Sequence, residues 1–393
     1  MRTAYILNVF RSAGCKAKRG KFKDLRPDDL LGQVLAETVK RSQINPEEIE
    51  DVIIGCAFPE GEQGMNVSRV ASFIAGLPID TPAMTINRFC SSGLQSIALA
   101  AERIMAGFAD CIVAGGVESM TMIPMGGVKY SANPGLIAKW PETYASMGIT
   151  AELVAEKYGV TREEQDRFAY ESHMKAVKAI KEGKFADEIV PVEVEYTALE
   201  PKGTVVKQKE MVTIDDGARE DTTIEGLAKL KPVFKLNGSV TAGNSSQMTD
   251  GAAACIVVSE EFLKRHNLTP MARFVGFSAR GVEPEIMGIG PIKSIPFVLK
   301  KVGLTFKDIE LIELNEAFAA QSLAVVKNLD LNPEIINVNG GAIALGHPLG
   351  CTGTKLTATL LNEMKRRKAR YGMVSMCIGG GMGAAGIFEN LMK

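Results

Sequence analysis

The sequence has few residues of several types, and each shortage argues against a class of function. Only three histidines occur among 393 residues, at positions 173, 266 and 347, and none lies at a ligand spacing from cysteines or carboxylates. We therefore expect no metal site. Lysine and arginine (45) balance aspartate and glutamate (46), so no global charge favours nucleic acid or an anionic membrane. An anionic ligand would have to be held by local groups.

Long apolar runs are also missing. No run reaches the roughly 18 residues of a membrane span, and polar residues interrupt the opening "MRTAYILNVFRSAG", unlike a signal peptide. The ending "NLMK" lacks a peroxisomal tripeptide, so we expect a cytoplasmic protein. The seven cysteines are odd in number and include no C-x-x-C pair, which predicts free thiols rather than a disulfide framework.

Two stretches share one pattern. "CSSGLQSIALAAERIMAGFADCIVAGG" and "CTGTKLTATLLNEMKRRKARYGMVSMCIGGG" each give a glycine turn, apolar residues at helical spacing and a short apolar strand. Gly93 matches Gly353, and each stretch follows an expected strand with Asn near its end, "AMTIN" and "IINVN". The repeat predicts an α/β protein with two similar halves, each with helices covering a mostly parallel sheet.

The segment between the halves has a different texture. A loop rich in Met and Gly, "TMIPMGGVKYSANPG", precedes charged helical segments, and Thr161 with Glu164 has the spacing of a capping box for a helix running towards Gly183. We interpret residues 121–249 as an insertion that covers the substrate. Residues 1–120 with 250–268 would then form the first half, and 269–393 the second.

Cys90 is the first candidate for chemistry. It lies between a strand and a helix expected to begin near Ser91, where the peptide dipoles favour a thiolate. The alternative is a small buried apolar side chain, which is the usual state of a free cysteine. Its placement makes Cys90 a better candidate for a reactive thiol than the other six cysteines.

His347 lies in a glycine-crowded loop, "NVNGGAIALGHPLGCTGTK". So much glycine indicates a close approach of the backbone to another group, and the histidine could be a base or a structural residue bonded to a loop carbonyl. Cys351 aligns with Ser91 in the repeat, which leaves Gly350 opposite Cys90. We therefore interpret Cys351 as structural.

The chain ends on "SMCIGGGMGAAGIFENLMK", where Gly381, Gly383 and Gly386 have the spacing of a dinucleotide-binding loop. Only seven residues follow Gly386, so the required helix, strand and acidic residue are missing and a dehydrogenase is excluded. Cys377 ends the strand expected over residues 371–378. It could be a second reactive thiol beside an oxyanion site, or a buried strand cysteine.

Asn315 follows an apolar strand in "LIELNEAFAAQSL", where a helix begins. Its amide could cap that helix or orient a water molecule in a site, and its position in the sequence does not decide between the two.

Four motifs together closely resemble the thiolase family: "NRFCSSGLQS" at 87–96, "NEAF" at 315–318, "GGAIALGHPLGCTGTK" at 340–355 and "CIGGGMGAAG" at 377–386. "TAGNSSQMTDGAAA" at 241–254 and "MGIGP" at 287–291 extend the resemblance along the chain. The motifs look most like degradative 3-ketoacyl-CoA thiolases. Ser146 supports this, because biosynthetic members often carry His before the Met-Gly pair. The resemblance implies a layered α/β/α/β/α core with an inserted loop domain.

The resemblance also implies roles for the site residues. Cys90 would accept the acyl group, Cys377 would exchange a proton with the acetyl-CoA carbon, and His347 would be the base. Asn315 would fix a water that forms one oxyanion hole with His347, and the N–H groups of Cys90 and Gly379 would form the other. The resemblance places the CoA contacts at four residues: Arg219, Ser246, Met147 and Phe318.

The expected partners are 3-ketoacyl-CoA, CoA and acetyl-CoA, with no redox cofactor or metal, in a homodimer or homotetramer. An acetoacetyl-CoA thiolase is the nearest alternative. A β-ketoacyl synthase fits less well, because those sites resemble Cys-His-His or Cys-His-Asn sets. A non-catalytic acyl-CoA-binding protein would have no reason to keep Cys90, His347 and Cys377 together.

Overall fold

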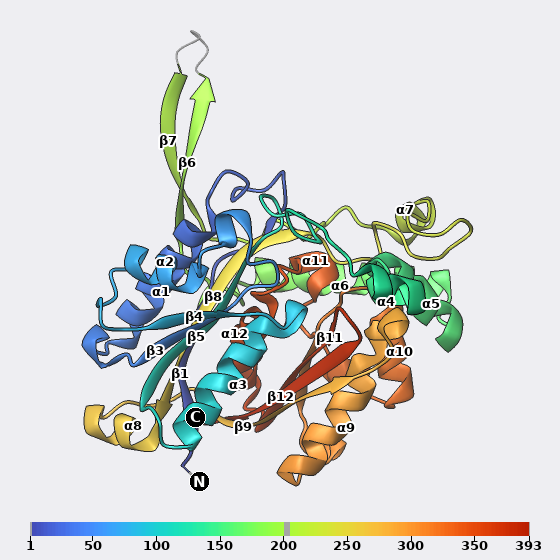
Figure 1. The fold of residues 1–393 in the computed structure, drawn as a ribbon. Helices are drawn as coiled ribbons and strands as arrows, with labels where there is room; N and C mark the ends of the chain where they lie inside the picture. Colours follow the sequence, from blue (N-terminus) through green and yellow to red (C-terminus); the bar gives the residue numbers. More distant parts are fainter. Residues whose placement is uncertain (1, 200–204, 393) are drawn as a thin grey trace.

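A long mixed sheet forms the centre of the fold in a computed structural model, which describes residues 2–199 and 205–392 (Figure 1). Its strand order is β10-β11-β12-β9-β1-β8-β5-β3-β4, with the short β2 paired to β8. The strands are β1 (Ala4–Arg11), β2 (Cys15–Lys16), β3 (Asp51–Gly55), β4 (Ala83–Ile86), β5 (Cys111–Ser119), β8 (Thr249–Ser259), β9 (Ala272–Gly281), β10 (Leu311–Leu314), β11 (Tyr371–Ile378) and β12 (Met382–Asn390).

The two halves of the sheet repeat one arrangement. In the first, β4, β3 and β5 are parallel, and β8 and β1 continue antiparallel. In the second, β10 and β11 are parallel, and β12 and β9 continue antiparallel. The halves join where β1 pairs with β9 at Tyr5–Arg273 and Ile6–Ala272. This confirms the two similar halves.

The expectation of a mostly parallel sheet is wrong. Six of the nine strand pairings are antiparallel and three are parallel. One reason is the tight turn between β11 and β12, because strands joined by so short a connection can only pair antiparallel.

Helices form three layers around the two half-sheets. Helices α1 (Pro27–Ser42) and α2 (Val67–Ile74) cover the outer face of the first half, and α9 (Gly290–Val302) and α10 (Ala319–Asn328) cover that of the second. Helices α3 and α12, over 92–105 and 352–367, lie between the half-sheets and pack against both. The order of layers is therefore α/β/α/β/α, as the resemblance implies. Two short helices, α8 (Glu260–His266) and α11 (Ala342–Leu345), complete the halves.

The two central helices touch where the repeat match placed its glycines. A Cβ on Gly93 would lie 2.8 Å from Thr354 Oγ1, and a Cβ on Gly353 would lie 2.1 Å from the backbone nitrogen of Leu94. Thr354 Oγ1 also donates to the Gly93 carbonyl at 3.0 Å. The helices can approach this closely only because neither carries a side chain there.

The strand expected in "IINVN" does not form. Residues Pro333–Ile335 make a 3-10 turn, and only Ile336 forms a bridge, to Ile312. Asn337 has a left-handed φ of 45°, and its side-chain amide bonds both the N–H (2.8 Å) and the carbonyl (2.7 Å) of Leu314. The asparagine side chain thus takes the place of a strand neighbour.

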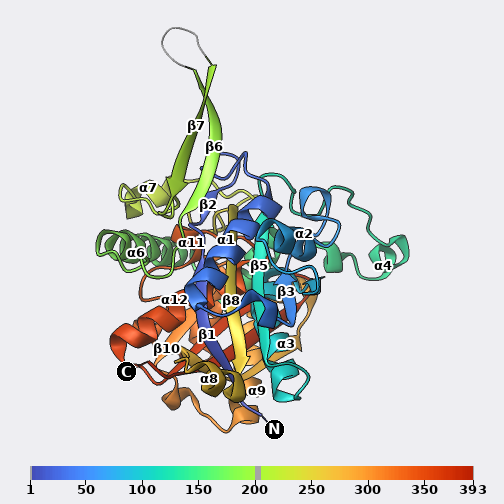
Figure 2. The ribbon, with the colours of Figure 1, turned by 90° about the vertical axis from the view of Figure 1, so that its left-hand side faces the viewer.

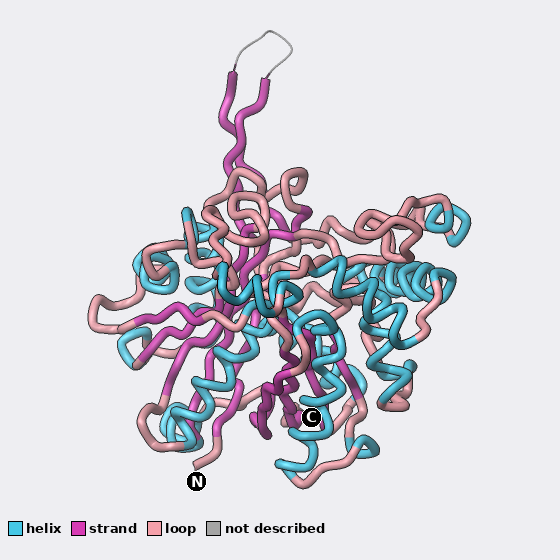
Figure 3. The backbone as a smooth tube through the Cα atoms, turned by 45° about the vertical axis from the view of Figure 1, so that its right-hand side comes forward, coloured by secondary structure: helices cyan, strands magenta, loops and turns pink. Residues whose placement is uncertain are grey.

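The segment between β5 and β8 holds four helices and a hairpin: α4 (Pro134–Lys139), α5 (Met147–Tyr158), α6 (Arg162–Lys181), β6 (Val192–Leu199), β7 (Val205–Val212) and α7 (Ile224–Ala228). The capping box of Thr161 and Glu164 is confirmed at the start of α6. Figures 1, 2 and 3 show the β6-β7 hairpin projecting from the body. The boundaries given above for the three segments stay predictions.

No helix within 2–199 and 205–392 is long and apolar enough to cross a membrane. All seven cysteines are free and buried, which confirms the absence of a disulfide framework.

Candidate active site

The candidate catalytic residues lie at the ends of strands and in the loops that follow them. Cys90 lies in a 3-10 turn (Phe89–Ser91) after β4, Asn315 follows β10, and Cys377 and Gly379 lie at the end of β11. His347 follows α11. The parallel strands β4 and β10 both end on this side of the sheet, where α/β proteins commonly place ligands.

Cys90 is almost buried, with 8% of its surface exposed. The backbone N–H groups of Gly379 and of Cys90 itself act on the thiol and favour a thiolate, which lowers the pKa of Cys90. Burial outweighs these donors and raises the pKa of Cys90 to about 11. The expectation of a ready thiolate at the helix start is therefore wrong for the free enzyme, and Cys90 needs a base.

Cys377 is fully buried, and burial, followed by the neighbouring Cys90, raises the pKa of its thiol well above the usual range. Cys377 also packs in an apolar cluster with Met147 and Phe318. The Phe318 ring makes an edge contact with Phe234, with centroids 6.2 Å apart. The structure therefore places both thiols at one site and puts two of the predicted CoA contacts beside the second thiol.

The hydrogen bonds of His347 fix its tautomer. Its Nδ1 lies 2.6 Å from Thr352 Oγ1, and that hydroxyl donates its only proton to the Pro348 carbonyl at 2.9 Å. Thr352 must therefore accept a proton from Nδ1, which leaves the lone pair on Nε2. Asn315 Nδ2 lies 3.3 Å from Nε2 and donates to it. His347 thus presents an unprotonated nitrogen to the site, as a general base requires.

Two further features suit His347 and Asn315 to catalysis. Burial, followed by the positive charge of Lys355, lowers the pKa of His347 to about 3, so the free imidazole is neutral. Asn315 Oδ1 is buried and has no hydrogen-bond partner among the described residues. A buried acceptor of this kind needs a water or ligand group, which fits the predicted bound water better than a helix cap.

The glycines of the turn between β11 and β12 lack a side chain for two different reasons. Gly380 and Gly381 have φ values of 78° and 82°, which other residues rarely adopt. Gly379 has no such constraint, and a Cβ there would lie 3.6 Å from Met147 Sδ and 3.8 Å from Phe89. The missing side chain at Gly379 leaves space beside Cys90 rather than relieving backbone strain.

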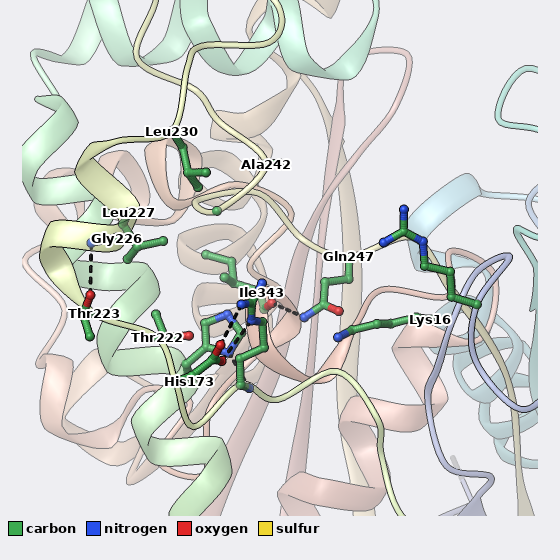
Figure 4. A pocket seen from close by; sticks show the side chains of 14 residues that line it. Lys16, His173, Thr222, Thr223, Gly226, Leu227, Leu230, Ala242, Gln247 and Ile343 are labelled. Carbon is green, nitrogen blue, oxygen red and sulfur yellow. Dashed lines mark hydrogen bonds and ion pairs between the residues drawn. The ribbon is translucent and has the colours of Figure 1, made fainter.

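The remaining CoA candidates lie along one surface. Arg219 is exposed, pairs with Asp221 at 2.9 Å, and lines a cavity of about 410 Å³ (Figure 4). Ser246 does not line that cavity. Its N–H donates to the Ala317 carbonyl at 2.9 Å, next to Phe318. Gln247 connects the two regions, because it lines the cavity and its carbonyl accepts the His347 N–H at 3.1 Å.

The same cavity has walls of two kinds. Leu227, Leu230 and Ala242 give an apolar side, and Lys16 lies at the other side with Gln247 (Figure 4). Arg19 also lines the cavity. Lys16 and Arg19 form no ion pair among residues 2–199 and 205–392. Sequence reasoning missed both, because they lie 200 residues from Arg219, although the run "KAKRGKFK" was a visible signal.

Glu118 is a second residue that the motifs did not reveal. It is fully buried at the end of β5, and its carboxylate accepts the backbone N–H of Ala57 and of Gly350, both at 2.8 Å, and the amide of Gln63 at 2.7 Å. It therefore ties the loop after β3 to the loop that carries His347. Cys351 is buried beside it, in agreement with its structural interpretation.

The fold thus consists of two matched α/β halves, and the paired thiols of Cys90 and Cys377 come one from each half. The family described as Thiolase, N-terminal domain matches residues 4–261, and Thiolase, C-terminal domain matches residues 268–390. The chain belongs to the thiolase family and is an acyltransferase.

Individual relatives agree over nearly the full length. A Bacillus subtilis protein named 3-ketoacyl-CoA thiolase is 53% identical, covering 99% of this chain and 100% of the relative. A human peroxisomal protein of the same name is 47% identical, covering 98% and 90%. Two crystal structures each match with a TM-score of 0.89. They are a Bacillus anthracis acetyl-CoA acetyltransferase, 42% identical over 100% and 99% of the chains, and a human mitochondrial 3-ketoacyl-CoA thiolase, 40% identical over 99% of each.

Proposed function

We propose that this chain is a 3-ketoacyl-CoA thiolase, which uses CoA to cleave a 3-ketoacyl-CoA into acetyl-CoA and an acyl-CoA shorter by two carbons. The observation that carries the proposal is the presence of two pairs of buried groups, the neighbouring thiols of Cys90 and Cys377 and the imidazole of His347 with the amide of Asn315 at 3.3 Å. Relatives named 3-ketoacyl-CoA thiolase support this substrate class. The reaction would belong to fatty-acid β-oxidation, in the cytoplasm.

In the first half-reaction His347 Nε2 takes the Cys90 proton, and the sulfur attacks the 3-keto carbon. The C2–C3 bond then breaks, its electron pair passes to C2, and Cys377 donates a proton there, which releases acetyl-CoA. The N–H groups of Cys90 and Gly379 both favour a negative charge on the Cys90 thiol, which supports a role for them in stabilising the charge that develops beside it.

In the second half-reaction the CoA thiol attacks the acyl group on Cys90. His347 first passes the proton that it took from Cys90 to the Cys377 thiolate. It then receives the CoA thiol proton and returns it to Cys90 when the acyl-CoA leaves, so both thiols and the imidazole end as they began. A water held by Asn315 Oδ1 and His347 would stabilise the enolate oxygen in the first half-reaction. Each step uses a side chain or N–H of this chain, and CoA enters as a substrate.

The cavity of Figure 4 is the proposed site of the phosphorylated end of CoA. Its apolar wall suits a base ring, and the cations Lys16, Arg19 and Arg219 suit phosphates. Arg19→Met should raise KM for CoA more than KM for dephospho-CoA. Lys23→Met, on the same loop but outside this cavity, is the matched control. Equal effects on both substrates would exclude a contact of Arg19 with the 3′-phosphate, the one phosphate that dephospho-CoA lacks.

The central test is thiolysis with the purified protein. Loss of the 3-ketoacyl absorbance is followed with acetoacetyl-CoA and with longer 3-ketoacyl-CoA substrates. Higher kcat/KM on the longer substrates supports the proposal, whereas turnover of acetoacetyl-CoA alone would favour the acetyl-CoA acetyltransferase activity that the Bacillus anthracis structure is named for. Binding without turnover would identify a carrier.

Two variants separate the thiols. Cys90→Ala should abolish labelling by radioactive acyl-CoA. Cys377→Ala should still become acylated but should lose exchange of the acetyl α-proton with solvent. Normal cleavage by Cys377→Ala would show that this division of roles is wrong.

We also propose a homo-oligomer that pairs through β4. This strand is the last in the sheet, and its outer edge has no partner among the described residues. Exposed apolar side chains surround it: Met65, Phe73, Ile74, Ile79 and Met84. An unpaired edge with apolar neighbours fits a second copy about a two-fold axis. Light scattering should give at least a dimer, and Met84→Lys should weaken it.

A further inference from the structure

Lys355 is a buried lysine for which the proposed reaction has no use. It lies on α12 with 4% of its surface exposed, and its Nζ donates to the carbonyls of Leu345 (3.1 Å) and Gly346 (3.2 Å). These two residues come directly before His347. The lysine therefore holds the chain where it enters the catalytic loop.

The same loop is fixed on its other side by neutral groups. The His347 N–H donates to the Gln247 carbonyl at 3.1 Å and to Thr249 Oγ1 at 3.2 Å. Gly346 has a φ of 80°, and a Cβ there would lie 2.1 Å from Thr249 Oγ1. Uncharged hydrogen bonds and close packing already hold this loop. Removing a charge from water is costly, so the buried ammonium needs a further explanation.

The charged groups behind the loop supply an explanation for the buried ammonium. Arg11 on β1 forms ion pairs with Glu188 and Asp215 at 2.7 Å each, so one guanidinium faces two carboxylates. Both carboxyl groups and Arg11 act on Lys355. Arg11 lowers the pKa of Asp215 against the effect of burial, whereas burial raises the pKa of Glu188 and raises that of Glu313 on β10 well above the usual range.

Without Lys355 one positive charge behind the His347 loop would be lost. This loss favours the imidazolium form, and an imidazolium has no lone pair to take the Cys90 proton. The Cys351 thiol also acts on the ammonium, and burial raises the pKa of that thiol to about 12.

We propose that Lys355 is a positioning residue for His347: its two hydrogen bonds hold the loop, and its charge keeps the imidazole neutral and able to accept a proton. The proposal rests on the role of His347 as base in the proposed function. It agrees with the lowered pKa of His347, for which the Lys355 charge is the second cause after burial.

The test is histidine ¹⁵N NMR, which suits a chain with three histidines. His173→Gln and His266→Gln assign the signals, and the protonated fraction of His347 is followed from pH 8 to pH 4.5. Lys355→Gln keeps a donor for the carbonyls but loses the charge. If the pKa of His347 rises by one unit from about 3, its protonated fraction at pH 4.5 rises about eightfold, from about 3% to about 24%.

Three variants complete the design. Lys355→Arg keeps the charge and should leave the fraction unchanged. Lys355→Met loses both charge and hydrogen bonds and should lower kcat more than Lys355→Gln does, at similar KM. Lys365→Gln, an exposed lysine on the same helix, should change neither measurement.

A folded Lys355→Gln variant with the parent's protonated fraction at pH 4.5 would overturn the proposal. If the neutral variants do not fold, the same titration is made on the unsubstituted protein. A midpoint of His347 protonation above pH 6 in that protein would also overturn the proposal. The NMR result does not depend on turnover. A shifted midpoint in a protein without thiolysis would therefore contradict the proposed function and leave the role of Lys355 intact.

Discussion

Thr352 offers the sharpest test of how His347 is prepared for catalysis. Thr352→Val removes the hydroxyl that accepts the Nδ1 proton at 2.6 Å and nearly preserves the volume of the side chain. The variant leaves a buried N–H without a partner, which costs about 1–3 kcal/mol. The cost falls on the tautomer with a free Nε2, so that tautomer becomes less populated.

At about 1.4 kcal/mol per factor of ten, this penalty corresponds to a kcat lower by about 5- to 150-fold. The assay is steady-state thiolysis, with KM expected to change little because Thr352 lies behind the imidazole. Thr352→Ser keeps the hydroxyl and should recover most of the rate.

Thr357→Val is the matched control. Thr357 lies on the same helix, is also buried, and donates to the carbonyl four residues earlier (2.8 Å), as Thr352 does, but has no bond to His347. Both variants lose one such bond, so Thr357→Val shows the effect of losing that bond alone. Equal kcat values for the two valine variants would refute the tautomer argument.

Two further predictions concern stability. Burial lowers the pKa of His173 from 6.5 to about 4, so the unfolded chain binds a proton first, and stability falls as the pH drops from about 6.5 towards 4. His173→Gln should remove up to about 2 kcal/mol of this loss at pH 5. The measurement is the free energy of unfolding in urea at pH 7 and at pH 5. The same difference between the two pH values in the variant and the parent would contradict the prediction. Gly353→Ala should lower the melting temperature far more than Gly226→Ala. The new Cβ at position 353 would lie 2.1 Å from the backbone nitrogen of Leu94, whereas the new Cβ at position 226 would lie 3.0 Å from the side chain of Thr223.

The sequence predicted much of this fold because the repeated unit is local. The match of Gly93 with Gly353 located both central helices, and the position of Cys90 before a helix followed from the residues around it. The directions of the strands could not be predicted in this way. β8 pairs with β1 and β5 across more than a hundred residues, and no local pattern records that partner.

The site was predicted unevenly for a similar reason. Residues inside motifs, such as Cys377 and Asn315, were found because the motifs mark them, although their roles remain predictions. The pKa of Cys90 was misjudged because the dipole of a helix is visible in sequence, whereas burial depends on the whole fold. Lys355 stood inside a quoted motif and still went unnoticed, because its hydrogen bonds to Leu345 and Gly346 appear only in three dimensions.

The crossing of α3 and α12 also bears on how this chain can be divided. Each of these helices covers the inner face of the other half's sheet as well as its own. A fragment cut near residue 268 would keep its strands but lose half of its central layer, and broad apolar surface would meet water. The N-terminal and C-terminal family models thus match two separate lengths of sequence, but the two lengths fold as one cooperative unit. Neither fragment could form its central layer without the other.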